Sequence, residues 1–139
     1  MGKQQNTIVC VSNFFKGADF MIALKELGNT VFLITSEKLR DKPWPRQHVD
    51  EVFYMPGQDT DWNLEDLLLG VGSLMKNNQI DAIVALDDFD VEKATYLREN
   101  LRIQGMGQTT GRYFRDKLAM RMRAKSCAIS NPQFCSLFN

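Results

Sequence analysis

The fold is decided by the stretch TIVCVSNFFKGADFMIALKELGNTVFLIT, residues 7–35. It contains two apolar runs of strand length, residues 7–12 and 30–35, of the kind expected for strands that are covered on both faces. Between these runs, the pattern of residues 16–27 predicts an amphipathic helix that Gly28 ends as a C-cap. Residues 7–35 therefore predict one βαβ unit, with parallel strands and a right-handed crossover.

The alternation of strands and helices continues along the chain. Residues 49–55 predict a weaker strand at the margin of the sheet. Residues 64–75 place leucines, valine and methionine at spacings of three and four, which predicts a helix capped by Asp61 or Asn63. Residues 81–86 predict a third buried strand. The sequence thus predicts an α/β fold, a doubly wound, Rossmann-like and mainly parallel sheet of four to five strands with helices on both faces.

Acidic residues follow the third buried strand directly. Asp87 and Asp88 lie at its carboxyl end, which is where open α/β sheets bind ligands, so both are candidates for substrate binding. The alternative is that Asp88 or Asp90 simply caps the next helix. The inward residues of that helix are Val91, Ala94, Leu97 and Leu101. After it, residues 102–105 predict a short linking strand.

The composition limits the class of protein. The 139 residues, of which 44% are hydrophobic, fit one domain with a single core. No run approaches the roughly 20 apolar residues of a membrane span, and the start lacks the apolar core of a signal peptide, so we expect a cytoplasmic protein that does not bind a membrane. Cys10, Cys127 and Cys135 lack paired spacing and His48 is alone, which supports neither a disulfide framework nor a metal site.

Charge is segregated along the chain although its total is zero. Between Arg112 and Lys125 there are six basic residues and the single acid Asp116, so this segment carries +5 and the remainder −5. Good helix formers predict one long basic helix from Gly111 to Ala128, which threonines of the preceding loop, residues 109–110, can cap. Such a helix is often only a solvated face. We expect no nucleic-acid binding, because the rest of the chain is acidic and lacks aromatic-rich strands.

Several catalytic motifs are absent from the sequence. A dinucleotide-binding loop requires G-x-G-x-x-G after the first strand, but the stretch SNFFKG at residues 12–17 has a single glycine. A phosphate-binding Walker loop and a serine nucleophile elbow are also missing. The chain therefore carries no complete set of catalytic residues.

A family resemblance rests on several short stretches. They are residues 7–12, ALKELG at 23–28, VDEVF at 49–53, IDAIVALDD at 80–88, Gly105 and, most specifically, RDKLAMR at 115–121. Together they resemble the N-terminal domain that precedes the ATP-grasp fold in biotin carboxylase, the large chain of carbamoyl-phosphate synthetase and related carboxylate-amine ligases. In that family, a lysine following aspartate at this place contacts a nucleotide phosphate. The resemblance implies this role for Lys117.

The resemblance also implies an incomplete enzyme. Residues 1–110 would be the α/β pre-ATP-grasp domain, and residues 111–139 a basic helix and tail that lead into an absent ATP-grasp domain. The absent lobes of the parent would supply the adenine pocket and the acidic magnesium ligands. The parent would use ATP and Mg to activate a small-molecule carboxylate as an acyl phosphate. We expect this chain to form one wall of the cleft, to bind no cofactor alone and to be inactive as a ligase.

Two further expectations remain open. A non-catalytic α/β binding or regulatory domain fits the same fold, with the aspartates as caps and the basic helix docking a partner. We also expect the isolated chain to form a homodimer through its C-terminal helix and tail, because apolar side chains there would lack their normal cover. These side chains are Ile129, Phe134, Leu137 and Phe138.

Overall fold

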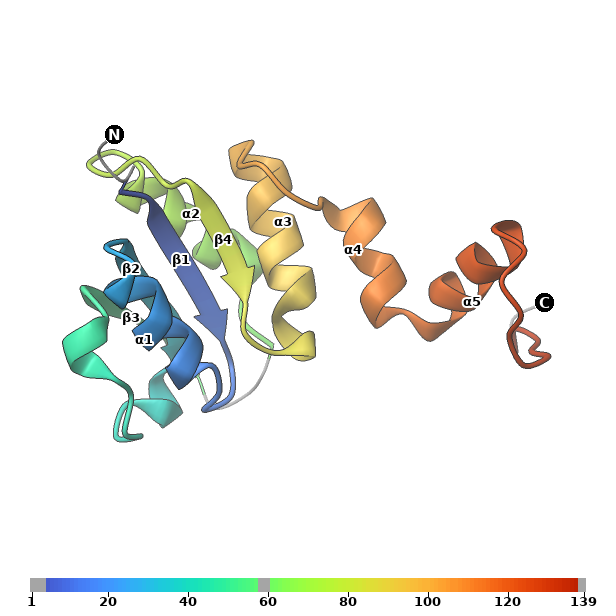
Figure 1. The fold of residues 1–139 in the computed structure, drawn as a ribbon, viewed down its shortest axis with the longest axis horizontal. Coiled ribbons are helices and arrows are strands. Elements are labelled where there is room, and N and C mark those ends of the chain that lie inside the picture. Colours follow the sequence, from blue (N-terminus) through green and yellow to red (C-terminus); the bar gives the residue numbers. More distant parts are fainter. Residues whose placement is uncertain (1–4, 58–60, 138–139) are drawn as a thin grey trace.

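A four-stranded parallel sheet forms the centre of the molecule. The computed structural model describes residues 5–57 and 61–137, and the strand order within it is β3-β2-β1-β4 (Figure 1). The strands are β1 (Thr7–Ser12), β2 (Thr30–Ser36), β3 (Glu51–Met55) and β4 (Ala82–Ala85). The predicted α/β fold is confirmed, and β3 lies at the margin of the sheet as expected.

Helices cover both faces of this sheet, as the sequence predicts. On one face lies α1 (Ala18–Glu26), and on the other lie α2 (Leu64–Leu74) and α3 (Val91–Leu101) (Figure 1). In the part of the chain that the structure describes, three short 3-10 helices occupy the connections. They are η1 (Glu37–Leu39), η2 (Arg46–His48) and η3 (Asp88–Asp90).

The sheet divides the core into two layers. Successive side chains of a strand point to opposite faces, so Val9 and Val11 of β1 pack toward α2 and α3, whereas Ile8 and Cys10 pack toward α1. Val9, Cys10 and Val11 are completely buried. Burial of each large apolar side chain contributes about 1.5–3 kcal/mol, which explains why continuous apolar runs form the central strands.

The start of α1 differs from the prediction by two residues. The helix begins at Ala18, because Gly17 adopts a left-handed conformation with φ of 77°. A Cβ atom at Gly17 would also lie 2.7 Å from Cδ1 of Leu86. Glycine is therefore required there both by the backbone and by the close approach of the strand-end loop after β4.

The expected cap of α2 is confirmed for one of its two candidates. The side chain of Asn63 accepts hydrogen bonds from the backbone N–H groups of Glu65 and Asp66, at 2.9 and 3.1 Å. These bonds satisfy two of the amide groups that a helix leaves unpaired at its start.

The short strand predicted over residues 102–105 is wrong. Arg102 ends α3 in a left-handed conformation with φ of 56°, and the N–H of Ile103 donates to the carbonyl of Arg98 at 2.9 Å. Ile103 is buried in the core layer formed with α2 and α3. Its apolar side chain thus closes the end of α3 instead of joining the sheet.

The single long basic helix predicted from Gly111 to Ala128 is also wrong. The segment forms two helices, α4 (Gln108–Arg115) and α5 (Lys117–Ser126), separated at Asp116. Asp116 has an extended backbone, and its carboxylate accepts hydrogen bonds from the N–H groups of Leu118 and Ala119. An aspartate that caps a new helix in this way interrupts the preceding one.

The threonines do not cap the first of these helices. Residues 109–110 lie inside α4, which begins after Gly107 without a side-chain cap. We call residues 5–107 the body and residues 108–137 the arm, and Figure 1 shows the arm leading away from the sheet. The predicted division after residue 110 stays a prediction, and α4 spans it. Phe138 lies outside the described residues.

Two helices pack closely where the arm meets the body. Gly111 of α4 is buried against α3, where a Cβ atom would lie 2.3 Å from Cγ2 of Thr95. Thr95 is itself almost completely buried, so only glycine permits this approach of the two helices. None of the helices in the described ranges is long and apolar enough to cross a membrane.

Candidate functional site

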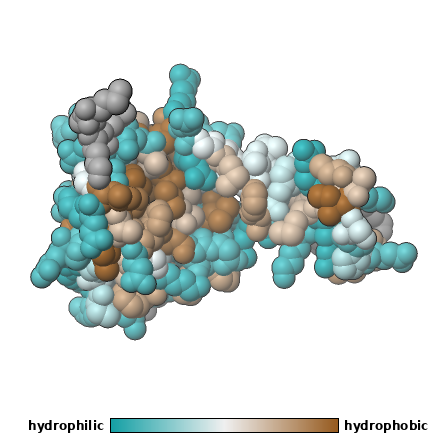
Figure 2. Space-filling view, viewed as in Figure 1, coloured by the Kyte–Doolittle hydropathy of each residue, from teal (hydrophilic) through white to brown (hydrophobic). Residues whose placement is uncertain are grey.

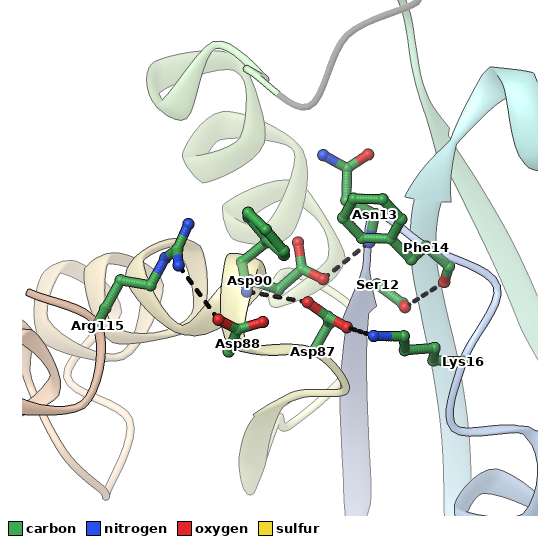
Figure 3. A network of polar contacts seen from close by, with 9 residues as sticks. Ser12, Asn13, Phe14, Lys16, Asp87, Asp88, Asp90 and Arg115 are labelled. Atoms are coloured by element: carbon green, nitrogen blue, oxygen red, sulfur yellow. Dashed lines mark hydrogen bonds and ion pairs between the residues drawn. The ribbon is translucent and has the colours of Figure 1, made fainter.

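The candidate site lies where the connections of β1 and β4 diverge. β2 and β3 are on one side of β1 and β4 is on the other, so the loops that follow β1 and β4 leave the sheet in different directions. Open α/β sheets bind ligands in the crevice at such a switch point. We call the residues that meet there the strand-end site (Figure 3). They are Ser12, Asn13, Phe14, Lys16, Asp87, Asp88, Asp90 and Arg115.

Asp87 occupies the buried part of this site. Its side chain is 2% exposed, it forms an ion pair with Lys16, and it accepts a hydrogen bond from the N–H of Phe89 at 3.1 Å. Burial raises the pKa of Asp87, but the hydrogen bond from Lys16 and the Phe89 amide outweigh this effect and lower it overall. Asp87 is therefore an ionised cap of η3, the short helix that precedes α3.

Asp88 lies at the surface of the site and contacts the arm. Its side chain is 61% exposed, and its Oδ2 lies 3.1 Å from Nη1 of Arg115. The guanidinium of Arg115 also stacks over the ring of Phe89, 4.2 Å from its centroid, and Phe89 packs against Phe14 with centroids 5.3 Å apart. These contacts connect α4 to the loops after both strands (Figure 3).

Asp90 is a buried member of the site that the sequence considered only as a cap. It occupies the N-cap position of α3, as the sequence allowed, but its side chain makes no capping hydrogen bond there. Instead, its Oδ2 accepts from the N–H of Asn13 at 2.9 Å, and its Oδ1 lies 3.3 Å from Nζ of Lys93. Burial raises the pKa of Asp90. The spacing of three between Asp90 and Lys93 is the one signal in the sequence that points to this pair.

The charges of the strand-end site are balanced. Each of its three carboxylates is paired with one cation, which is Lys16 for Asp87, Arg115 for Asp88 and Lys93 for Asp90. Among the described residues, no group of three or more acidic, histidine or cysteine side chains could hold a metal ion. These residues therefore do not fit a magnesium ion, because the ligands it needs are already neutralised.

Lys117 lies outside this network. It is the first residue of α5, its side chain is exposed, and it forms no ion pair with any residue in the described ranges. The preceding Asp116 has a lowered pKa, because it accepts a hydrogen bond from the N–H of Ala119 and contacts Arg112. The structure thus brings Asp87, Asp88 and Arg115 together and leaves Lys117 as an available cation two residues further along the chain.

Comparisons with known proteins show the fold. No protein-family model matches the sequence, and no curated protein matches it. Among solved structures, an L-amino acid ligase from Bacillus licheniformis matches 94% of this chain with a TM-score of 0.72 and 17% identity. Phosphoribosylglycinamide synthetase from Anaerococcus prevotii matches 88% with a TM-score of 0.68 and 17% identity. The biotin carboxylase domain of a thermophilic 2-oxoglutarate carboxylase matches 91%, with a TM-score of 0.67 and 17% identity.

These matches have one feature in common. This chain spans only 32%, 29% and 29% of the lengths of those three proteins, respectively. Each of these three structures thus shares the α/β fold of this chain over about a third of its length, which agrees with the fold that the resemblance implied. A glycosyl transferase of family 9 from Veillonella parvula shares the fold less closely, with a TM-score of 0.59 and 16% identity over 77% of this chain and 33% of that one. The fold alone therefore does not specify a reaction.

Proposed function

We propose that this chain is the N-terminal domain of an ATP-grasp ligase that activates a small-molecule carboxylate. The supporting observation is the coverage of the matches, which is 88–94% of this chain but 29–32% of three enzymes of that kind. Two of the three are named as a ligase and a synthetase. The chain by itself then forms one wall of the substrate and nucleotide cleft, and the remaining lobes of the parent are its partners.

In this wall, Lys117 is suited to bind the nucleotide, whereas the strand-end acids are not suited to bind its magnesium ion. When bound, ATP supplies the phosphoryl group that converts the carboxylate to an acyl phosphate. Lys117 holds an ATP phosphate in this proposal, because its exposed ammonium is a mobile point charge that forms no ion pair within the described part of the chain. Magnesium is held by lobes outside this chain, since the acids of the strand-end site are already paired.

The two strand-end aspartates have different tasks in this proposal. Asp88 contacts the substrate, because its carboxylate is exposed to the cleft side of the sheet. Asp87 is buried, caps η3 and forms an ion pair with Lys16, so its task is to hold the loop after β4 in place. Asp88→Asn in the parent should then impair turnover more than thermal stability.

Nucleotide titration tests the proposal. We expect calorimetry to detect no micromolar binding of ATP and Mg to the present chain, because one lysine contact cannot supply about 8 kcal/mol. The coding sequence beyond Asn139 should continue into two further lobes, and the extended chain should bind ATP. Lys117→Ala should weaken that binding at least about tenfold, a loss of about 1.4 kcal/mol, whereas the matched change Lys125→Ala should not.

Two results would contradict the proposal. Micromolar affinity of the present chain for ATP would show that it needs no further lobes. A stop codon directly after Asn139 would favour the non-catalytic α/β binding or regulatory domain, since no ligase could then be completed.

A further inference from the structure

The arm carries an open groove that combines apolar and basic side chains. It has a volume of about 1280 Å³ and runs between α5 and the tail that follows it. Its apolar side includes Leu118, Met122 and Ile129, and its cations are Arg112, Arg123 and Lys125. No acidic side chain is among its lining residues in the described part of the chain. Figure 2 shows apolar surface beside polar surface at the outer end of the arm.

The apolar residues of this groove are unusually accessible. Met122 is 59% exposed and Ile129 is 61% exposed. Arg112 is paired with Asp116, but Arg123 and Lys125 form no ion pair with any side chain that the structure describes. Two exposed apolar side chains and two such cations in one groove favour an occupant that is itself both apolar and acidic. A second arm does not meet this requirement, because two groups of cations would face each other.

The body carries a surface with the required properties on α2. Glu65, Asp66 and Leu69 share one face of this helix, since they are separated by three and four residues. Leu69 is 72% exposed. Neither Glu65 nor Asp66 forms an ion pair with any side chain that the structure describes. We call these three residues the acidic face.

The groove and the acidic face cannot meet within one molecule. Figure 1 shows α2 against the sheet, whereas α5 lies at the far end of the arm, beyond α4. The charge of the chain is divided in the same way, with +5 between Arg112 and Lys125 and −5 elsewhere. The acidic face therefore cannot fill the groove of its own molecule, whereas the acidic face of a second copy of this chain can.

We propose that two copies of this chain form a reciprocal dimer in which the acidic face of each α2 docks in the arm groove of the other. Leu69 packs against Met122 and Ile129, while Glu65 and Asp66 face Arg123 and Lys125. The contact occurs twice about a two-fold axis, so it closes and does not propagate. This inference does not depend on the proposed ligase function, and either can fail without the other.

Sedimentation of the full chain at two salt concentrations provides the first test. We expect the mass to rise from one chain to two as protein concentration increases at about 50 mM salt. At about 1 M salt the dissociation constant should rise at least about tenfold, because the opposite charges are screened. A chain that stays monomeric at low salt and high concentration would overturn the proposal.

Charge reversal identifies the two surfaces. Glu65→Lys with Asp66→Lys should weaken self-association at least about tenfold, and so should Arg123→Glu with Lys125→Glu, because repulsion replaces attraction in both symmetric contacts. The decisive experiment is to mix these two variants in equal amounts. In a mixed dimer the unchanged groove meets the unchanged acidic face, and the reversed groove meets the reversed face, so both contacts pair opposite charges and the mixture should dimerise again.

A matched variant controls for the change in net charge. Glu26→Lys with Glu92→Lys alters the same number of exposed acids on α1 and α3 and should leave the dimer unchanged. Far-UV circular dichroism should show that every variant keeps its helices. If both reversed variants dimerise as the original chain does, and only removal of residues 129–139 abolishes the dimer, the contact is made by the tail and the proposal is wrong.

Discussion

The body and the arm form helices from similar residues, but the helices of the body bury side chains on a sheet and those of the arm remain largely exposed. Leucines, methionines and alanines form helices in both, yet α2 and α3 bury side chains such as Leu67, Val71 and Leu97, whereas α5 buries none. In α4 only Gly111 is buried. Helices of the body are thus stabilised by packing on a sheet, whereas in the arm α5 is stabilised by its Asp116 cap and α4 by its contacts with the body. The comparison teaches that apolar content predicts a helix without predicting what covers it.

The largest expected effect tests packing directly. Leu97 is completely buried in the layer between the sheet and α3, so Leu97→Ala should reduce the free energy of unfolding by about 2–5 kcal/mol. Met120 of the arm is 43% exposed, and Met120→Ala should cost less than about 0.5 kcal/mol. Urea unfolding followed by circular dichroism measures both. Equal losses would mean that the arm is as well packed as the body.

A smaller effect is expected at the contact between the two regions. Gly111→Ala places a Cβ atom against the buried Thr95, so we expect a loss of about 1–3 kcal/mol or a separation of α4 from α3. Gly70 of α2 is the control, because a Cβ atom there meets nothing within 4 Å. Gly70→Ala should stabilise by about 0.5–1 kcal/mol, since alanine favours a helix.

Hydrogen exchange decides how Gly111→Ala acts. If the arm separates, amides of α4 should exchange faster while those of β1 and β2 stay protected. Unchanged exchange together with unchanged stability would show that the glycine is not needed for the contact.

The smallest effect concerns two carboxylates with lowered pKa values. Asp87→Asn should cost about 1 kcal/mol at pH 7, because the ion pair with Lys16 is lost while the amide oxygen still caps η3. The folded-state pKa of Asp87 is below the ordinary value of about 3.9, so its contribution is present above that pH and is lost as pH falls through the lower value. The difference between the two proteins should therefore disappear in acid.

Asp116 of the arm provides the matched case for Asp87. Its pKa is also lowered, but it is held by amides of α5 and by Arg112 at the surface. Asp116→Asn should leave the unfolding midpoint of the body unchanged at every pH. Its one expected effect is a lower helix content, because α5 loses its cap. A shift of that midpoint, measured by thermal unfolding at several pH values, would show that the arm and the body unfold together.

Prediction from sequence succeeded where the signal is local and strong. The apolar runs at residues 7–12 and 30–35 indicated central strands, because only burial on both faces explains them. The prediction of a strand at residues 102–105 failed, because the single apolar side chain of Ile103 fills the core without entering the sheet. Prediction from sequence failed again at Asp116, whose capping role competes with the helix-forming residues on both sides.

The site was predictable in position but not in its contacts. The acids at residues 87–88 could be placed at a strand end from the pattern alone. Their partners could not, since Lys16 is 71 positions from Asp87 and Arg115 is 27 positions from Asp88. Only the folded chain shows that each acid is paired with a cation.

The accessible thiols of the described residues lie on the arm and not in the sheet. Cys10 is buried in β1, where burial raises its pKa to about 12, while Cys127 and Cys135 are exposed on the arm. Only a thiolate reacts readily with maleimides, and only an accessible one is reached. A thiol-directed fluorophore would therefore attach to the arm alone, without any substitution, and report its motion relative to an unlabelled sheet. The same thiols would crosslink copies through the arm in air, so mass measurements require a reductant.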